Sequence, residues 1–488
     1  MCSPSEHGRG GLTTTACAAS STSASASAAA SASNAERGVV VFEVAPYVKV
    51  PDIGSGIRLP PSLPLGLLFT GFFSFGGSPA SALPLPSVAQ RDPLRVLILM
   101  SATGGGHRAS AQAIRAAFHE RFGAHRFAVD IVDPITDHSR WPVSIMPPSY
   151  NFMVRHPWIW RINYKLSEPR LLHRPFLRAV TAYCASAVES MYEKYKPDLV
   201  VSVHPLLQHA PLRVLKKMVA SGAMKPTPFA TVVTDFATCH TTWFHRDVNK
   251  CFVPTRGIER IARRMGLSSS QIVMRGLPVR PDFAKLGARR RGTAEREAMR
   301  PALGIDKKLP CVLLVGGGEG MGPVEATATA LSRRLDGAGQ VVVICGRNES
   351  LASRLRKQDF GATRVEVRGF VHNMAEYMGA SDCIITKAGP GTIAEALICG
   401  LPMILNDYIP CQEASNVPYV LDHGVGIFIK DPDDVAQTVS HWFSASGADE
   451  LREMASKAAE LGRPEATVRI VEDLAALIPE EKRAGLPI

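Results

Sequence analysis

A glycine-rich loop stands between a predicted strand and a predicted helix near the end of the sequence. Residues 382–386 form a short apolar run that predicts a buried strand, and residues 393–399 predict a helix. Between them, Gly389 and Gly391 interrupt regular structure. The start of a helix presents free backbone N–H groups and the positive end of its dipole, and both attract anions. The pattern therefore predicts a phosphate site.

Glu395 lies one helical turn beyond this loop. Because a carboxylate repels phosphate, we expect it to accept hydrogen bonds from ribose hydroxyls instead. The two glycines would let a diphosphate approach the backbone closely. These residues predict a site for a nucleoside diphosphate, and the alternative is an ordinary strand–helix turn with a surface Glu.

The first half of the chain also places polar residues after apolar runs. Residues 95–100 predict a buried strand, and residues 107–122 predict a helix after a glycine-rich loop. In parallel sheets, ligands bind beyond the carboxyl ends of strands, where His107, His204 and Asp235 fall. Further strands are expected at residues 128–132, 199–203 and 229–234.

The second half repeats the alternation of strands and helices. Its strands are expected at residues 311–315, 341–345, 364–368, 382–386 and 403–405. Such alternation predicts an α/β fold class with two doubly wound, Rossmann-like domains that face a cleft. Residues 433–475 are predicted to be mostly helical and to pack back across the first domain.

Several separate motifs follow one another between residues 94 and 475. They are residues 104–108 (GGGHR), 202–206 (SVHPL), 238–245 (TCHTTWFH), 276–281 (GLPVRP), 316–323 (GGGEGMGP), 388–396 (AGPGTIAEA), 400–402 (GLP) and 412–416 (QEASN). With these motifs the chain resembles glycosyltransferase family 28, and within it the plant and algal monogalactosyldiacylglycerol synthases most closely. The resemblance implies the glycosyltransferase B architecture.

The resemblance implies a site for UDP-galactose as the donor. The guanidinium of an arginine suits paired phosphate oxygens, and polar side chains suit the hydroxyls of the hexose. The residues assigned are Phe370 and Val371 for uracil, Glu395 for ribose, Arg280, Gly317, Gly318, Gly389, Pro390, Gly391 and Thr392 for the diphosphate, and Gln412 and Glu413 for the hexose.

The resemblance also implies direct displacement with inversion at the anomeric carbon, so the diacylglycerol hydroxyl needs a base. His107 is the candidate, because a neutral imidazole can take a proton near neutral pH. Asp133 could orient its ring. Asp431 and Asp433 form the one obvious D-x-D pair, which we interpret as a helix cap. We therefore expect no metal and no cofactor besides the donor substrate.

Residues 138–178 mix aromatic and basic side chains. Residues 155–178 contain six Lys or Arg and one acid, Glu168. This composition suits an anionic membrane surface, and the alternative is a solvated basic helix whose aromatics pack into the domain. The residues assigned to the acceptor or to lipid are Trp141, Pro142, Arg155, Trp158, Trp160, Arg161, Lys165 and Trp243.

The amino-acid composition indicates which kinds of partner the chain can bind and in which compartment it works. The 488 residues carry a net charge of +11, which favours anionic partners, and no nucleic-acid-binding motif accompanies it. Ten scattered cysteines without a CxxC pair predict free thiols. Residues 1–38, rich in Ser, Ala and Thr, predict an organelle-targeting peptide; the alternative is a disordered tail. The resemblance implies that the organelle is the plastid and that the protein is peripheral at the plastid envelope.

Four parts of the chain are predicted. They are residues 1–92 as targeting peptide and linker, 93–283 as the acceptor and membrane-facing domain, 284–308 as the interdomain link, and 309–480 as the nucleotide-sugar domain. Three other functions remain open: a UDP-glucose-dependent diacylglycerol glucosyltransferase, a UDP-sugar 2-epimerase of similar fold, and an inactive lipid sensor. The sequence does not predict an oligomeric state.

Overall fold

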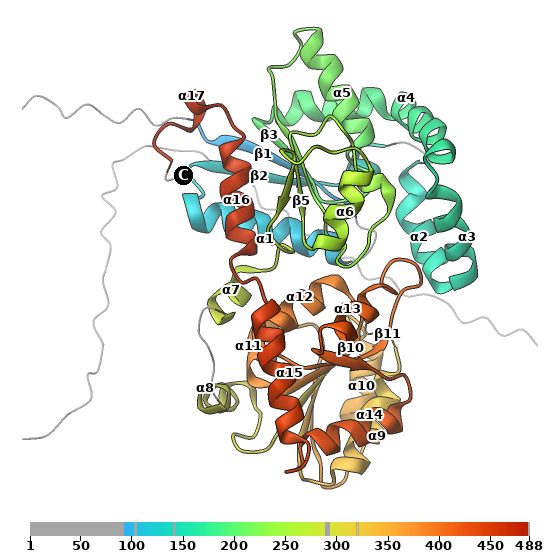
Figure 1. Cartoon of the computed structure of the whole chain (residues 1–488), viewed down its shortest axis with the longest axis vertical. Coiled ribbons are helices and arrows are strands. Elements are labelled where there is room, and N and C mark those ends of the chain that lie inside the picture. The colour runs from blue at the N-terminus through green and yellow to red at the C-terminus, as the bar shows by residue number, and fades with distance from the viewer. Residues whose placement is uncertain are drawn as a thin grey trace, which may run out of the picture. The chain divides into compact units, whose positions relative to one another are not determined.

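The computed structural model of the chain describes residues 92–101, 105–139, 143–287, 293–318, 320 and 322–486. All of them belong to one compact unit, Pro84–Ile488. The predicted leader and linker lie outside the described residues up to position 91. The described part contains two parallel sheets flanked by helices (Figure 1).

The first domain is built on a six-stranded parallel sheet in the order β2-β1-β3-β4-β5-β6. Its strands are β1 (Leu94–Leu99), β2 (Phe127–Val132), β3 (Leu199–Ser202), β4 (Phe229–Val232), β5 (Lys250–Val253) and β6 (Ile272–Met274). Its helices are α1 (Gly105–Phe122), η1 (Pro134–His138), η2 (Val143–Ile145), α2 (Met146–Arg155), α3 (Pro157–Ser167), α4 (Arg170–Tyr195), α5 (His209–Ala220), η3 (Thr241–Trp243) and α6 (Arg256–Arg264).

Strand β1 shows why this sheet is covered on both faces. Successive side chains of a strand point to opposite faces. Val96 and Ile98 pack into the cluster that contains α1, whereas Leu97 and Leu99 pack into the cluster that contains α5. A continuous apolar run therefore produces a buried central strand, whose last residue, Leu99, pairs with both β2 and β3.

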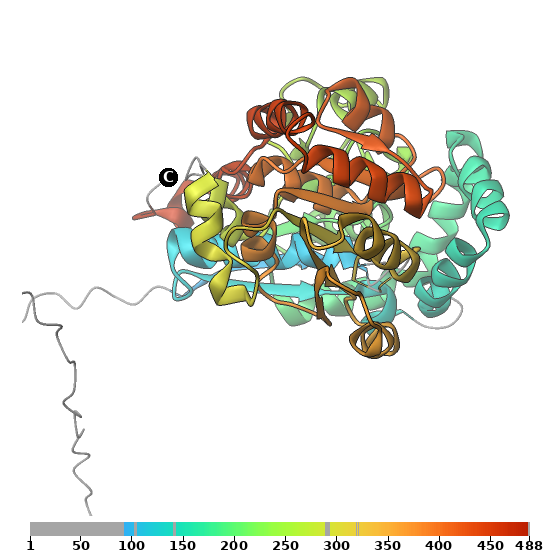
Figure 2. The same ribbon diagram turned by 90° about the horizontal axis from the view of Figure 1, so that it is seen from below.

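The second domain repeats this plan in the order β12-β11-β10-β7-β8-β9. Its strands are β7 (Cys311–Val315), β8 (Gln340–Ile344), β9 (Arg364–Arg368), β10 (Cys383–Lys387), β11 (Met403–Asp407) and β12 (Gly426–Phe428). Its helices are α9 (Val324–Leu335), α10 (Glu349–Lys357), α11 (Met374–Ala380), α12 (Pro390–Cys399), α13 (Asn416–Asp422), α14 (Pro432–Trp442) and α15 (Ala448–Leu461). Figure 2 shows α14 and α15 from another side. The link between the domains holds α7 (Pro281–Gly287), α8 (Thr293–Met299) and η4 (Pro301–Leu303).

The end of the chain returns to the first domain. Helix α16 (Ala466–Ala476) lies beside α1 in Figure 1, and α17 (Glu480–Arg483) follows it. Ile470 and Leu474 are fully buried in the cluster that contains α1 and β1. The Thr467 hydroxyl donates to the Val279 carbonyl (2.7 Å) and accepts from the Val279 N–H (2.9 Å). Residues 433–475 are mostly helical, as predicted, but only α16 packs on the first domain, whereas α14 and α15 pack on α9 and α12 of the second.

The structure confirms the predicted fold class and most of the predicted strands. Three short strands, β5, β6 and β12, were not predicted. Strands β6 and β12 have three residues each, too few to show a periodicity. Every cysteine in the described part is a free thiol, and most are buried. None of the helices described is long and apolar enough to cross a membrane.

Candidate active site

The predicted phosphate loop lies at the start of α12. Gly389 precedes the helix in an extended conformation, and Pro390 occupies its first turn, where a missing N–H costs least. A Cβ at Gly391 would meet nothing within 4 Å, so this side of the loop is open. A Cβ at Gly389 would lie 3.3 Å from Lys387 Nζ. The loop therefore has one open side and one side occupied by a cation.

A second glycine loop follows β7 and approaches the same lysine. Gly317 adopts a φ of +69°, a left-handed conformation that favours glycine. A Cβ there would lie 3.6 Å from Lys387 Cε, and one at Gly318 would lie 3.5 Å from an Arg347 nitrogen. Lys387 thus lies between the two loops assigned to the diphosphate. The sequence analysis missed it; the signal was a lysine at the end of the strand, directly before the loop.

Arg280 and Glu395, predicted for the diphosphate and the ribose, are paired with each other. Arg280 Nη2 lies 3.0 Å from Glu395 Oε1. Burial raises the pKa of the Glu395 carboxyl, and the charge of Arg280 opposes that shift. The Arg280 Nε atom is buried without a hydrogen-bond partner among the described residues. The guanidinium therefore keeps a donor that a phosphate oxygen could satisfy.

The two residues predicted for the hexose have different partners. Glu413 is 4% exposed; one carboxylate oxygen pairs with Lys387 Nζ and the other accepts from the Ile409 N–H at 2.9 Å. Gln412 Oε1 instead accepts from the Tyr150 hydroxyl at 2.8 Å. The loop assigned to the sugar is therefore held by its own domain at Glu413 and by the first domain at Gln412.

The predicted base-binding residues follow strand β9. Phe370 is 50% exposed, and the Arg347 guanidinium lies 5.8 Å from its ring centroid. Its ring also contacts His372 at 5.1 Å. An exposed aromatic ring beside two further planar groups suits contact with a flat base, in addition to the main-chain bonds predicted at Val371.

His107 lies in the first turn of α1 and is only 8% exposed. Its Nδ1 lies 2.9 Å from Thr234 Oγ1, and its ring packs edge-on against His204 at 4.8 Å. Burial lowers the pKa of His107 to about 4, although a backbone hydrogen bond with Val203 opposes the shift. The imidazole is therefore neutral at physiological pH, as a base must be. The ring lies beyond the carboxyl end of β1, where a ligand was expected to bind, but it is enclosed by His204 and Trp243, which pack against it.

Asp235 is a second titratable group in this region. It is 7% exposed, and Trp243 Nε1 donates to its Oδ2 at 2.7 Å. Burial raises the pKa of Asp235 to about 7; the Trp243 hydrogen bond lowers it and the charge of Glu413 raises it further. Asp235 is bonded to Trp243, which packs near His107, and its pKa also responds to the charge of Glu413 in the loop assigned to the sugar. Its position after a predicted strand was noticed in the sequence, but no role was assigned to it.

Residues predicted for lipid contact lie in different environments. Trp158 is 65% exposed on α3, and Arg161 and Lys165 are exposed beside it. Trp243 has no exposed surface and packs near His107, which excludes contact with the lipid surface and leaves its assignment to the acceptor as a prediction. Trp141 and Pro142 lie outside the described residues, and the structure does not describe the side chain of Arg155.

Two further expectations concern Asp133 and Asp431, and His245 ends the motif at residues 238–245. Asp133 Oδ1 accepts from two N–H groups at the start of η1, whereas Thr234 is the residue in contact with the His107 ring. His245 packs edge-on against His209. Asp431 accepts from the first N–H groups of α14, which confirms the predicted cap. The described residues contain no group of three or more His, Cys, Asp or Glu that could hold a metal ion.

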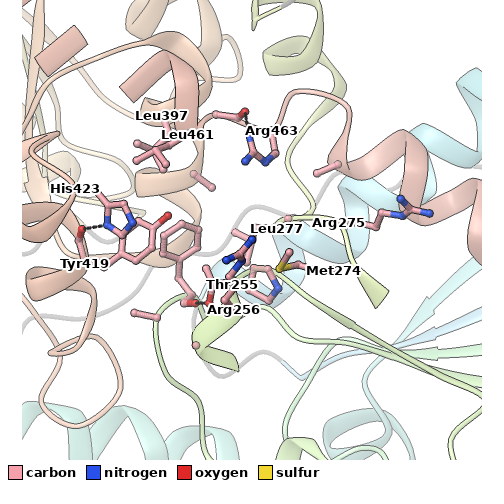
Figure 3. A pocket seen from close by; sticks show the side chains of 18 of the residues that line it. Thr255, Arg256, Met274, Arg275, Leu277, Leu397, Tyr419, His423, Leu461 and Arg463 are labelled. Carbon is pink, nitrogen blue, oxygen red and sulfur yellow. Dashed lines mark hydrogen bonds between the residues drawn. The ribbon is translucent and has the colours of Figure 1, made fainter. Parts of the chain in front are cut away.

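A cavity of about 1020 Å³ lies elsewhere between the two domains. Figure 3 shows Arg256 and Met274 from the first domain, Tyr419 from the second, and Arg463 from the segment that leads to α16. Helix α12 lines this cavity with Leu397, on a different side from the loop at its start. None of the residues predicted for the donor lines the cavity, so it is separate from the candidate active site.

The architecture defines the class of protein. Two doubly wound parallel domains, with glycine loops at strand ends of the second, form the glycosyltransferase B fold. The MurG structure from Acinetobacter baumannii shares it, with a TM-score of 0.50 and 17% identity, over 79% of this chain and all of that one. A Listeria monocytogenes chain named as a UDP-N-acetylglucosamine 2-epimerase matches with a TM-score of 0.50 and 14% identity, over 81% of this chain and 98% of that one. At these identities the likeness concerns the fold alone.

Sequence comparison identifies the family. Residues 107–279 match the family model of monogalactosyldiacylglycerol (MGDG) synthase, and residues 311–470 match the glycosyltransferase family 28 C-terminal domain. Monogalactosyldiacylglycerol synthase 1, chloroplastic, of Arabidopsis thaliana is 48% identical over 411 residues, which cover 83% of this chain and 74% of the relative. The chloroplastic enzyme of Spinacia oleracea is 48% identical over 405 residues, covering 82% and 75%. The chain belongs to the monogalactosyldiacylglycerol synthase family.

Proposed function

We propose that the chain transfers galactose from UDP-galactose to sn-1,2-diacylglycerol, giving monogalactosyldiacylglycerol in the chloroplast. The observation that carries this function is the 48% identity to chloroplastic monogalactosyldiacylglycerol synthases across both domains. The protein is a hexosyltransferase, as predicted. We further propose that it acts at the plastid envelope as a peripheral protein.

The second domain would hold the donor. Gly317 and the first turn of α12, at Gly391 and Thr392, would offer backbone N–H groups to the diphosphate, and Glu395 would bind the ribose. Arg280 and Lys387 supply two positive charges near these loops. Each of these cations is paired with a carboxylate, Glu395 or Glu413. We propose that their N–H groups and the helix dipole stabilise the leaving UDP by hydrogen bonds and that the reaction needs no metal ion.

The first domain would supply the base. In a direct displacement, the diacylglycerol oxygen bonds to the anomeric carbon while the bond from that carbon to the UDP oxygen breaks. His107 would accept the hydroxyl proton, because burial keeps its imidazole neutral. Its contact with Thr234 orients the ring. The buried carboxyl of Asp235 is the alternative base in this region.

Helix α3 would contact the lipid surface. Trp158, Ile162 and Leu166 recur every four residues on one face and are more than half exposed. Arg161 and Lys165 are exposed next to this stripe. An exposed apolar stripe flanked by cations suits partial burial in an anionic bilayer, from which the acceptor would enter the site.

Incubation of the purified chain with diacylglycerol vesicles and labelled UDP-galactose or UDP-glucose tests this function. We expect galactolipid from UDP-galactose, with little product from UDP-glucose. Preferred transfer of glucose would favour the glucosyltransferase alternative. Conversion of a UDP-sugar without any lipid product would favour the epimerase, and absence of both reactions in a folded protein that binds diacylglycerol would favour the lipid sensor.

A further inference from the structure

Two aromatic side chains of the first domain reach the sugar loop of the second. The Tyr150 hydroxyl, on α2, donates to Gln412 Oε1 at 2.8 Å. The Trp160 Nε1–H, on α3, donates to the Pro410 carbonyl at 2.9 Å. The two rings pack against each other at a right angle, with centroids 5.2 Å apart. They therefore form one unit that contacts the loop at two points.

The sugar loop, residues 408–413, is otherwise held mainly at one end. The Glu413 carboxylate binds Lys387 and the Ile409 N–H, and the Glu413 N–H donates to the Ile409 carbonyl. Cys411 adopts a φ of +65°, which is costly for a residue with a side chain and persists only where surrounding contacts hold it. Within the described part of the chain, the side chain of Gln412 has one hydrogen-bond partner, Tyr150.

The direction of this hydrogen bond determines what Gln412 can offer a ligand. Burial raises the pKa of the Tyr150 hydroxyl well above its ordinary value, and the nearby charges of Glu413 and Asp235 raise it further. The phenol therefore keeps its proton and acts as a donor. An amide offers one carbonyl oxygen as acceptor and one NH₂ group as donor. With Tyr150 occupying one of the two lone pairs of the oxygen, the NH₂ group keeps its full capacity to bind a sugar hydroxyl.

We propose that Tyr150 is a positioning residue for the donor sugar: it binds the Gln412 side-chain oxygen, so that the Gln412 NH₂ group faces the transferred hexose. Trp160 supports this arrangement by holding the Pro410 carbonyl of the same loop. The inference rests on the proposed function, which assigns Gln412 to the hexose. It also means that the helices assigned to the lipid surface help to order the donor site.

Tyr150→Phe in the full chain tests the proposal, because it removes one hydroxyl and keeps the ring that packs on Trp160. Calorimetry should show UDP-galactose binding weakened about three- to tenfold, the effect of one neutral hydrogen bond, and UDP binding unchanged. With diacylglycerol vesicles, KM for UDP-galactose should rise by a similar factor while kcat changes less. Adding Tyr150→Phe to Gln412→Ala should have almost no further effect, because Tyr150 acts through Gln412.

Tyr195→Phe is the matched control, since Tyr195 lies at the end of α4 and contacts His138 through its ring. Unchanged UDP-galactose affinity in Tyr150→Phe would overturn the proposal. Equal weakening of UDP and UDP-galactose would make Tyr150 a general structural residue, and an undiminished effect in the Gln412→Ala background would place its action elsewhere. If Gln412→Ala alone leaves UDP-galactose affinity intact, Gln412 does not bind the hexose and the proposal falls, while galactosyl transfer by the unmodified chain would still stand.

Discussion

His107 and Asp235 are two buried titratable residues whose pKa values shift in opposite directions. The pKa of His107 falls from 6.5 to about 4, and that of Asp235 rises from 3.8 to about 7. The unfolded chain binds the His107 proton more readily, so this residue's contribution to stability is lost as pH falls from 6.5 towards 4. Asp235 holds its proton more tightly when folded, so its contribution is lost as pH rises from about 4 through 7. Between about pH 4 and 6.5 the two contributions to the free energy of unfolding change in opposite directions and should partly cancel.

The pH dependence of activity distinguishes the two candidate bases. If His107 is the base, kcat/KM should stay nearly constant from pH 8 to about 5.5 and fall towards pH 4. His107→Ala should lower kcat about a hundred- to ten-thousandfold, with UDP affinity retained. A fall in kcat/KM already near pH 7, together with a loss of kcat in Asp235→Asn as large as that expected for His107→Ala, would assign the base to Asp235 instead.

Lys387 is expected to bind the diphosphate. Lys387→Met removes the charge between the two glycine loops and should weaken UDP binding by about 1.5–3 kcal/mol, the range for a hydrogen bond to a charged group. Binding of uridine, measured by the same calorimetry, should not change. Lys357→Met, at an exposed position on α10, is the control. Lys387→Met leaves the Glu413 carboxylate without its partner, so a second variant combines Lys387→Met with Glu413→Gln. Unchanged UDP affinity in both variants would rule out binding of the diphosphate by Lys387.

Helix α3 has two sides with different surroundings. The inward side of α3 contacts the sugar loop through Trp160, while Trp158 and Leu166 point away and are exposed. A four-residue spacing places residues on one side of a helix, so both sides are visible in the sequence. Only the fold shows that the inward side reaches residue 410, because that contact spans 250 positions.

Arg161→Gln with Lys165→Gln is predicted to weaken binding to anionic vesicles. Each cation near such a surface contributes about 1 kcal/mol at low salt, and screening reduces this contribution. Sedimentation with anionic and neutral vesicles should show a clear loss for the anionic ones only. Arg333→Gln with Lys457→Gln, at exposed positions of the second domain, should bind as the original chain does. Equal losses in both pairs would indicate a general charge effect without a role for α3.

At the scale of the whole molecule, the last helices connect the two domains. Helix α16 follows the second domain in sequence but completes the core of the first, and Arg121 and Arg275 form ion pairs with it. Folding of the first domain therefore depends on residues almost 200 positions beyond its last strand, as the bond between Val279 and Thr467 illustrates.

Ile470→Ala should destabilise the first domain although Ile470 lies near the end of the chain. Ile470 is fully buried, and removing a buried Ile side chain costs about 2–5 kcal/mol. Hydrogen exchange should show faster exchange of the β1 amides, and denaturant unfolding should show the loss of stability. Leu421→Ala, at a half-exposed position of α13, should change stability by less than about 0.5 kcal/mol. Unchanged exchange of the β1 amides would show that α16 does not stabilise the core of the first domain.

The fold class and the glycine loops could be predicted from the sequence because these features are local, and the donor residues assigned from it stay a prediction. Apolar runs, glycine spacing and helix starts act within about ten residues, and each loop follows its own strand. The pairing of Arg280 with Glu395, the position of Lys387 between two loops, and the burial of Trp243 and His107 were decided only by the tertiary structure. Each depends on which segments meet in space, and hence on packing between elements that are far apart in the chain.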